Sequence, residues 1–413
     1  MLRHALGMAW KVLGRRKVFT GISLFGIGLT LTVLMVAAAM LDHVFGADPP
    51  ETRLHRTLGI YGLGMVGESA SRTSFPGYAF LEAHARDLPG VEEESFFRNL
   101  GWLTAYPRGR KVTYWLKRTD GAFWEILEFV FVEGRPLAAD DVERARRVAV
   151  INESTRDAFF GGAPAVGRTL DVEGMPHEVV GVVRDVPFLR FTPFADVWAP
   201  LTTAPNDAWR DEVAGDFQAL LLARSRADFP EIRAAFESRI AEAVPAEQEF
   251  DRYHAGADTY FEFVSRAIFS SNARESHPAR LRAVLATAAV LFMLLPSLNL
   301  VNLNLSRILE RSGEIGVRKA FGASARALTG QFLVENVVLT LLGGAVGLAL
   351  AALALEGLEA TGWIPHAELG LNLRIFAWGL GLALGFGLLS GVYPAWRMSR
   401  LDPVQALRKR TSR

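Results

Sequence analysis

The chain has 413 residues, a formal net charge of +1 and a hydrophobic content of 50%. The near balance of charge argues against nucleic-acid binding. The absence of cysteine excludes a disulfide framework, a thiolate metal site and a thiol nucleophile. The apolar residues gather in blocks of about twenty or more without a charge, which is long enough to cross a bilayer. The composition therefore predicts an integral membrane protein.

The first apolar block, residues 18–41, contains no Asp, Glu, Lys, Arg or His and follows a basic head. A cleavable secretion signal has a hydrophobic region of roughly 7 to 15 residues, so this longer block predicts a retained transmembrane helix, with a cleaved signal as the weaker alternative. Leu2, Leu6 and Leu13 recur at helical spacing in the head. This spacing suits either an amphipathic helix on the inner membrane surface or a cytoplasmic extension of the first span.

Three further apolar blocks follow in the last third of the chain, at residues 283–305, 332–355 and 375–396. Basic residues crowd the loop between the second and third blocks and the tail after the fourth, which places both on the cytoplasmic side. We therefore expect a membrane protein with four transmembrane α-helices, one before and three after a large extracytoplasmic α+β domain. Both termini are expected in the cytoplasm.

The expected domain organisation follows from these spans. The segment between the first two spans changes to short strands and helices separated by turn residues, which is typical of a globular α+β domain and is long enough for two subdomains. The expected boundaries are 1–41 for the basic head and first span, 42–282 for the extracytoplasmic domain, 283–398 for three spans with a cytoplasmic loop at 306–330, and 399–413 for a basic tail.

The clearest local pattern in the extracytoplasmic segment begins at residue 148. Residues 148–151 predict a buried strand, Asn152 is expected to cap a helix that runs to Phe160, and Gly161 is expected to end that helix. A hairpin is expected next, with strands at 169–172 and 177–183 and a turn at 173–176.

Aromatic residues are frequent in this segment. They could line a groove for an apolar cargo or a partner protein, but core packing is the favoured interpretation because aromatic side chains dominate most protein interiors. The residues concerned are Trp102, Tyr106, Tyr114, Trp115, Trp124 and Phe129.

Catalytic motifs are missing from the sequence. It contains no Gly-Lys-Ser or Gly-Lys-Thr of a phosphate-binding loop and no Gly-x-Ser-x-Gly nucleophile elbow. His177 precedes Glu178, but Gly181 occupies the place of the second histidine of a zinc protease, so a structural strand histidine is the better interpretation. We expect no catalytic residue and no metal site in this chain.

Polar residues within the spans are costly in hydrocarbon and need an explanation. Asn302 and Glu335 are candidate membrane-interface residues. Polar groups of the second span could bond to neighbouring helices, as at a dimer contact, or lie at the headgroup level, whereas an interfacial carboxylate at Glu335 is favoured over an ion pathway. Small-residue pairs that allow close helix approach occur at Gly343 and Gly347, Gly381 and Gly385, and Gly387 and Gly391.

Three ordered motifs carry a family resemblance. The cytoplasmic loop reads ERSGEIGVRKAFGAS over residues 310–324 and continues with QFLVE at 331–335, and the end of the chain reads GVYPAWR at 391–397 and LDPVQALR at 401–408. The extracytoplasmic segment contains GRPL at 134–137, VAVINES at 148–154 and VVGVV at 179–183. In this order the motifs resemble those of MacB/FtsX-type ABC transporter permeases, with a MacB-like periplasmic core domain and an FtsX-like transmembrane domain.

The resemblance implies a non-catalytic permease subunit in a bacterial inner membrane. It implies that a separate cytoplasmic ATPase binds ATP and Mg, so that no cofactor is expected in this chain. It also implies that ATP hydrolysis there moves the extracytoplasmic domain, a mechanism called mechanotransmission. The implied ATPase-coupling residues are Glu310, Arg311, Glu314, Ile315, Gly316, Val317, Arg318, Lys319 and Gly322.

The partners implied by the resemblance are the ATPase, a second permease copy that is identical or different, membrane lipids and, as a further candidate, a periplasmic adaptor. The implied activity is export or extraction of peptides, lipophilic compounds or lipoproteins. The alternative is an FtsX-like regulator that transmits force to a cell-wall hydrolase without transport. The cargo itself is not encoded in any motif of this sequence.

Overall fold

The computed structural model describes residues 17–245, 247–269, 275–292, 294, 317, 321, 324–363, 366 and 369–399. These residues form two compact units. The first, here called the helical unit, contains the described parts of Met1–His43, Ala283–Trp363 and Glu368–Arg413. The second, here called the sheet domain, contains those of Val44–Arg282 and Ile364–Ala367.

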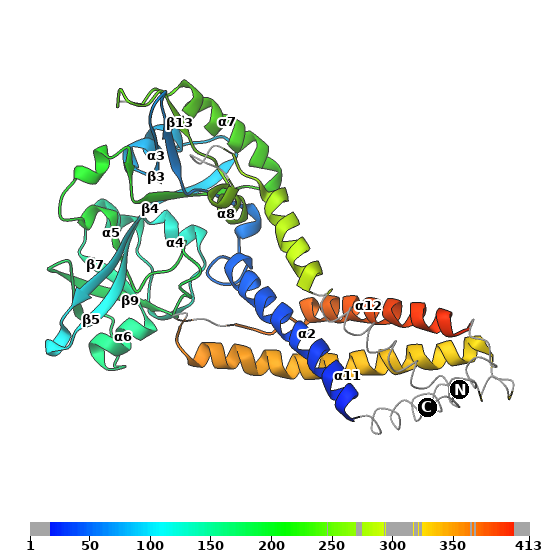
Figure 1. Cartoon of the computed structure of the whole chain (residues 1–413). Coiled ribbons are helices and arrows are strands. Elements are labelled where there is room, and N and C mark those ends of the chain that lie inside the picture. The colour runs from blue at the N-terminus through cyan, green and yellow to red at the C-terminus, as the bar shows by residue number, and fades with distance from the viewer. Residues whose placement is uncertain are drawn as a thin grey trace. The chain divides into compact units, whose positions relative to one another are not determined.

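Three long helices supply most of the described helical unit: α2 (Lys17–Phe45), α11 (Ala325–Ala360) and α12 (Leu373–Ser399) (Figure 1). Two segments are long and apolar enough to cross a membrane, Thr20–Phe45 and Leu333–Ala360, and Leu373–Gly385 is a shorter apolar helix. The second expected span, 283–305, falls largely outside the described residues, although 278–292 are helical. The count of four spans therefore stays a prediction.

Helices α2 and α11 approach each other backbone to backbone. A Cβ atom added at Gly347 would lie 2.9 Å from the carbonyl oxygen of Gly28, and one at Gly343 would lie 2.7 Å from the side chain of Ile27. The hydroxyl of Thr32 donates to the carbonyl oxygens of Gly28 (2.8 Å) and Gly347 (3.1 Å). The glycines of α11 thus allow a close helix contact that a bridging hydroxyl reinforces.

The other small-residue pairs behave differently. A Cβ atom added at Gly381 or Gly385 of α12, or at Gly357 of α11, would meet nothing within 4 Å among the described residues. Gly387 and Gly391 lie outside the described side chains. Of the three predicted pairs, only Gly343 and Gly347 is therefore shown to hold a helix contact.

The sheet domain has an α+β fold with two lobes, and this confirms the predicted fold class of the segment. Its larger sheet has the strand order β1-β12-β4-β5-β10-β7-β9-β6, with β8 paired to β9, and its smaller sheet has the order β11-β3-β2-β13. The pairs β5 with β10 and β7 with β9 are parallel, and the other neighbouring strands named here are antiparallel. The sheet is therefore mixed, with helices packed around it.

The strands are β1 (Thr57–Ile60), β2 (Leu63–Val66), β3 (Ser71–Pro76), β4 (Val91–Ala105), β5 (Val112–Thr119), β6 (Phe131–Gly134), β7 (Val148–Asn152), β8 (Thr169–Val172), β9 (Met175–Val183), β10 (Val197–Pro200), β11 (Ala214–Gly215), β12 (Phe217–Ala223) and β13 (Arg252–His254). The helices are α3 (Tyr78–His84), α4 (Ala122–Ile126), α5 (Ala139–Glu143), α6 (Glu153–Phe160), α7 (Phe229–Glu242) and α8 (Tyr260–Phe269), and short 3-10 turns lie at Leu54–Arg56, Pro107–Gly109, Leu201–Thr203, Ala208–Asp211 and Arg226–Asp228.

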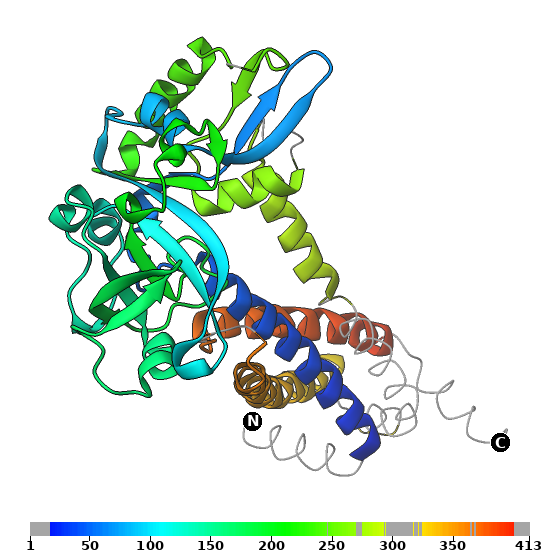
Figure 2. The ribbon, with the colours of Figure 1, turned by 90° about the vertical axis from the view of Figure 1, so that its left-hand side faces the viewer.

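Strand β12 separates two hydrophobic cores. Alternate side chains of a strand point to opposite faces, so Phe217, Ala219 and Leu221 join the core beneath α3 and α7, whereas Leu220 and Leu222 join the core of the other lobe. Strand β4 extends between the two lobes, because its first half pairs with β12 and its second half pairs with β5 (Figure 2). The two lobes therefore share strands and are not joined by a flexible linker.

The predicted strand and helix after residue 148 are confirmed. Asn152 ends β7 and caps α6, and its side chain accepts from the amide of Thr155 at 2.9 Å. Gly161 ends α6 with a φ of 70°, a left-handed conformation that glycine adopts at no steric cost.

The predicted hairpin turn at 173–176 was too long. Strand β9 begins at Met175, so Glu173 and Gly174 alone make the turn, with φ of 53° and 78°. Such a two-residue turn matches the twist of the flanking strands. Pro176 is accommodated within the strand opposite Asp171, where β9 pairs with β8 only.

Core packing was the right prediction for most of the aromatic residues but not for all. Tyr114 and Trp124 are buried, and Trp115 and Phe129 pack against the core. In contrast, Trp102 is 50% exposed and Tyr106 is 66% exposed. Both lie in or beside the β4–β5 hairpin, and Trp102 also packs against the rings of Trp115, Phe188 and Phe194.

The helix contact generates a test with matched glycines in one helix. Gly347→Ala places a methyl group 2.9 Å from a backbone oxygen of α2, whereas Gly357→Ala places one in open space. We expect Gly347→Ala to destabilise the full chain by about 1–3 kcal/mol through overpacking. Gly357→Ala should be neutral or slightly stabilising, because alanine favours a helix more than glycine does. Thermal unfolding in detergent measures both, and equal melting temperatures would contradict the contact.

Candidate functional site

Of the predicted ATPase-coupling residues, the structure describes only Val317. Glu310, Arg311, Glu314, Ile315, Gly316, Arg318, Lys319 and Gly322 lie outside the described residues, as does Asn302. Their roles stay predictions.

Val317 is helical, and an exposed aromatic residue, Phe321, lies four positions later. The amide of Phe321 donates to the carbonyl of Val317 at 3.0 Å, which is the spacing of one helical turn. The side chain of Val317 is 43% exposed and that of Phe321 is 89% exposed. A large apolar side chain this accessible suits a protein contact. Phe321 was not among the predicted site residues, although its place inside the matched motif was a signal that could have found it.

The second described part of the predicted site is Glu335 in α11. This helix begins at Ala325. Glu335 is only 3% exposed, and its carboxylate accepts a hydrogen bond from the side-chain amide of Gln331 at 3.1 Å. Asn336 beside it is also buried. The carboxylate is therefore held within the helical unit.

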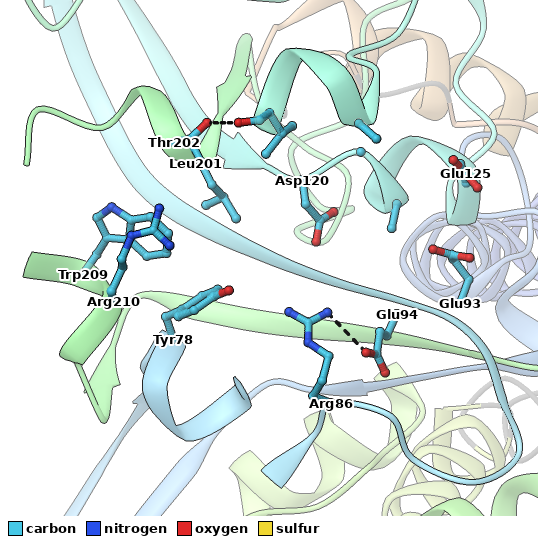
Figure 3. A pocket seen from close by; sticks show the side chains of 14 residues that line it. Tyr78, Arg86, Glu93, Glu94, Asp120, Glu125, Leu201, Thr202, Trp209 and Arg210 are labelled. Carbon is cyan, nitrogen blue, oxygen red and sulfur yellow. Dashed lines mark hydrogen bonds and ion pairs between the residues drawn. The ribbon is translucent and has the colours of Figure 1, made fainter. Parts of the chain in front are cut away.

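The sheet domain contains a cavity of about 410 Å³ between α3, β4, α4 and α5 (Figure 3). Its lining combines carboxylates, two guanidinium groups and aromatic surface. These side chains can bind a ligand by charge and by apolar contact. The charged and aromatic lining residues are Tyr78, Arg86, Glu93, Glu94, Asp120, Glu125, Trp209 and Arg210.

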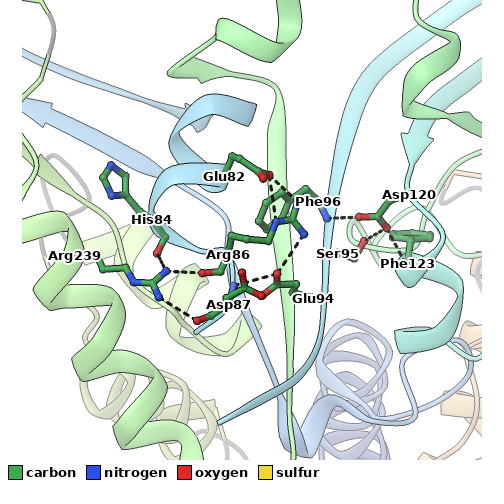
Figure 4. Close-up of polar contacts among 10 residues, drawn as sticks. All are labelled: Glu82, His84, Arg86, Asp87, Glu94, Ser95, Phe96, Asp120, Phe123 and Arg239. Carbon is green, nitrogen blue, oxygen red and sulfur yellow. Dashed lines mark hydrogen bonds and ion pairs between the residues drawn. The ribbon is translucent and has the colours of Figure 1, made fainter. Parts of the chain in front are cut away.

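Arg86 organises one wall of this cavity. Its guanidinium contacts Glu82 at 2.7 Å and Glu94 at 3.2 Å and lies over the ring of Phe96 at 4.3 Å (Figure 4). Glu94 also accepts from the amide of Asp87 at 3.1 Å. This network fixes the turn after α3 against β4.

The carboxylates of the cavity differ in environment. Burial raises the pKa of Asp120 to about 6, although hydrogen bonds from Ser95 (2.7 Å) and the amide of Phe96 (2.8 Å) oppose the shift. Burial and the adjacent carboxylates, Glu125 first among them, raise the pKa of Glu93. Asp120 thus ties β4 to its neighbours, while Glu93 faces the cavity beside like charges.

His177 has the structural role that its position in a strand predicted. It is fully buried in β9, and its ring nitrogens contact the carbonyl of Met175 (3.0 Å) and the hydroxyl of Thr203 (3.3 Å). Burial lowers the pKa of His177. Within the described part of the chain there is no group of three or more His, Cys, Asp or Glu side chains placed to hold a metal ion.

Comparison with known proteins then decides the family. Residues 20–239 match the family model of the MacB-like periplasmic core domain, and residues 286–403 match that of the FtsX-like permease C-terminal region. The first match alone covers more than half of the chain. The chain belongs to the MacB/FtsX-type ABC transporter permeases.

Individual relatives agree with this assignment. The pyoverdine export ATP-binding/permease protein PvdT of Pseudomonas aeruginosa is 26% identical over 98% of this chain and 58% of its own length. The macrolide export ATP-binding/permease protein MacB of Chromobacterium violaceum is 28% identical over 98% of this chain and 61% of its own length. The chain therefore spans about three fifths of the length of these relatives.

The periplasmic region of MacB from Actinobacillus actinomycetemcomitans is a solved structure that overlaps the chain. It is 16% identical, covers 52% of this chain and 94% of its own, and has a TM-score of 0.36. An overlap of this size adds no weight to the family assignment, which rests on the sequence matches.

The wall of the cavity generates a stability test. Arg86→Ala removes one cationic partner of the largely buried Glu94, and we expect a loss of about 1–3 kcal/mol, the cost of leaving a buried acceptor underpaired. The matched control is Arg72→Ala, which breaks an exposed pair with Glu247 in the same lobe and should cost about 0–1 kcal/mol. Urea unfolding of the full chain compares them, and equal losses would show that Arg86 adds no more than a surface charge.

Proposed function

We propose that this MacB/FtsX-type permease forms the membrane part of an ABC exporter that works by mechanotransmission. ATP hydrolysis by a cytoplasmic ATP-binding partner, which would hold ATP and Mg, moves the helices, and the helices move the extracytoplasmic domain. The observation that carries the proposal is the direct backbone contact between α2 and α11 at Gly28 and Gly347. This contact lets a displacement of α11 act on α2 without being absorbed by mobile side chains.

The proposed arrangement has four spans, with both termini and the loop 306–330 in the cytoplasm. The described cytoplasmic contact residues would be Val317 and Phe321, whose side chains are accessible. The undescribed coupling residues, Glu314 and Arg318 among them, would add charges of both signs. Two permease copies, identical or different, would place their loops against two ATP-binding partners, and a periplasmic adaptor is a further candidate partner.

The proposed cargo class is lipophilic compounds, peptides or lipoproteins taken up on the outer side of the membrane. Support for small-molecule cargo comes from the names of PvdT and MacB, which describe pyoverdine export and macrolide export. The cavity in the sheet domain offers carboxylates and aromatic surface to such a ligand. Regulation of a cell-wall hydrolase has no support from these relatives, so export is the favoured function.

Recruitment of the ATPase is tested by charge reversal. The double substitution Glu314→Lys with Arg318→Glu should lower co-purification of the ATP-binding partner about tenfold, and Phe321→Ala should act in the same direction, because coupling contacts concentrate in a few charged and aromatic residues. The control exchanges the charges of an exposed pair in the sheet domain, Arg72→Glu with Glu247→Arg. Unchanged recovery of the ATPase with the loop variants would contradict the coupling role.

The topology is tested by cysteine labelling, because the chain has no native cysteine. Val317→Cys and Val244→Cys introduce single thiols at exposed positions of the proposed cytoplasmic loop and of the extracytoplasmic domain. In intact cells a membrane-impermeant maleimide should label position 244 and leave position 317 unlabelled until the membrane is opened. Labelling of both positions in intact cells would overturn the proposed orientation.

A further inference from the structure

The loop between β9 and β10, residues 184–196, is contacted by two segments that connect the sheet domain to long helices. The first segment follows α2, which ends at Phe45, and contains Asp48 and Glu51. The second lies between α11, which ends at Ala360, and α12, which begins at Leu373, and contains His366. All of these contacts lie within the sheet domain.

Arg190 holds the segment that follows α2. Its guanidinium donates to the carbonyl of Asp48 at 2.9 Å and to the carboxylate of Asp48 at 3.1 Å, and it lies 3.5 Å from the carboxylate of Glu51. Arg190 is 4% exposed and Glu51 is 6% exposed. A guanidinium that binds a carbonyl and two carboxylates at once fixes geometry as well as charge.

Lys117 supports the same contact from β5. It is fully buried, and its ammonium donates to the carbonyl of Phe191 at 3.1 Å and to that of Thr192. Burial raises the pKa of Glu51 to about 7, and the charges of Arg190 and Lys117 oppose this shift. Burial also lowers the pKa of Lys117 well below its usual range. Two buried basic side chains therefore fix the 184–196 loop: Lys117 bonds to it from β5, and Arg190 belongs to it and bonds to the segment after α2.

His366, in the second segment, contacts one carboxylate near each end of the same loop. Its Nδ1 lies 3.4 Å from the carboxylate of Asp185 and its Nε2 lies 3.9 Å from that of Asp196. Asp185 also accepts from the hydroxyl of Ser154 at 2.7 Å, and Asp196 accepts from the amide of Trp115 at 2.7 Å. The contact with Asp185 raises the pKa of His366 and lowers that of Asp185, which favours the charged form of both.

We propose that residues 184–196 are the element through which the sheet domain receives movement of the helices, with Arg190 as the positioning residue for the α2 connection and Asp185 and Asp196 as those for the α11–α12 connection. The loop directly joins the end of β9 to the start of β10. Strand β9 pairs with β7, and β10 pairs with β7 and β5, in the middle of the large sheet. A displacement of either connection therefore acts on the centre of the sheet. This inference rests on the proposed function, for which it names the receiving residues.

Hydrogen exchange of the full chain in lipid nanodiscs tests whether the two contacts act through one loop. His366→Ala removes only the second contact, yet we expect amides of residues 46–53 to exchange about tenfold faster, because residues in one network couple energetically. Arg190→Lys keeps the charge but loses the planar fork, and it should raise exchange in 46–53 and in 184–196 by less than Arg190→Gln does. Arg72→Ala is the control, since it breaks an ion pair elsewhere in the domain.

The outcomes separate this inference from the proposed function. Faster exchange in 46–53 on His366→Ala, with no change on Arg72→Ala, supports the shared loop. Exchange that rises only around the substituted residue overturns it, whether or not the ATPase co-purifies. Unchanged recovery of the ATPase with the charge-reversed loop would overturn the proposed function and leave the exchange result standing.

A functional readout follows in the reconstituted complex with its ATP-binding partner. Arg190→Gln should leave ATP hydrolysis unchanged and lower the ratio of exported cargo to hydrolysed ATP, because the ATPase contact is intact while the receiving element is loosened. Arg190→Lys should restore part of that ratio. A parallel fall of hydrolysis and export would indicate general misfolding and contradict a positioning role.

Discussion

At Gly28 and Gly347 the backbones of α2 and α11 meet with no side chain between them, and Thr32 donates to a carbonyl on each helix. Helices in lipid gain little from burying apolar surface against each other, so close packing and hydrogen bonds decide how they associate. The contact therefore fixes the register of the pair. Because α11 follows the proposed cytoplasmic loop in the chain and α2 leads into the sheet domain, the contact links the two ends that the proposed mechanism must connect.

The proposed mechanism requires a rigid sheet domain that moves as one body when the helices move. Buried polar residues that bond strands to neighbouring turns contribute to this rigidity. Arg118 is 1% exposed, yet its guanidinium reaches the hydroxyl of Thr203 at 2.6 Å and the carboxylate of Glu173 at 2.6 Å. Buried charges of this kind are costly unless they are paired and hydrogen-bonded, and the Nε of Arg118 has no partner among the described residues. The bonds that Arg118 does make join β5 to the turn of the β8–β9 hairpin and to the segment after β10.

The sequence predicted what depends on local patterns and missed what depends on neighbours distant in the chain. Asn152 and Gly161 act as helix caps, which local backbone chemistry decides. The pairs Gly343 and Gly347, and Gly381 and Gly385, have the same spacing, but among the described residues only the first pair has a helix against it. Spacing alone cannot tell the two apart, because the difference lies in the partner helix. The coupling residues were predicted by family resemblance, and the described structure adds Phe321, which becomes notable through its exposure.

The contacts of Arg190 and His366 could not be predicted from the sequence, because they join residues that are far apart in the chain. Arg190 and Asp48 are 142 positions apart, and no motif or periodicity connects them. The fold brings them together because β9 and β10 place the loop between them beside the segment that contains Asp48. The two contacts also differ in geometry: the guanidinium of Arg190 donates to a carbonyl and a carboxylate of Asp48, whereas the ring of His366 lies 3.4 and 3.9 Å from two carboxylates. A guanidinium that donates to several acceptors at once fixes their relative positions. The segment that follows α2 is therefore held in a defined geometry against the loop.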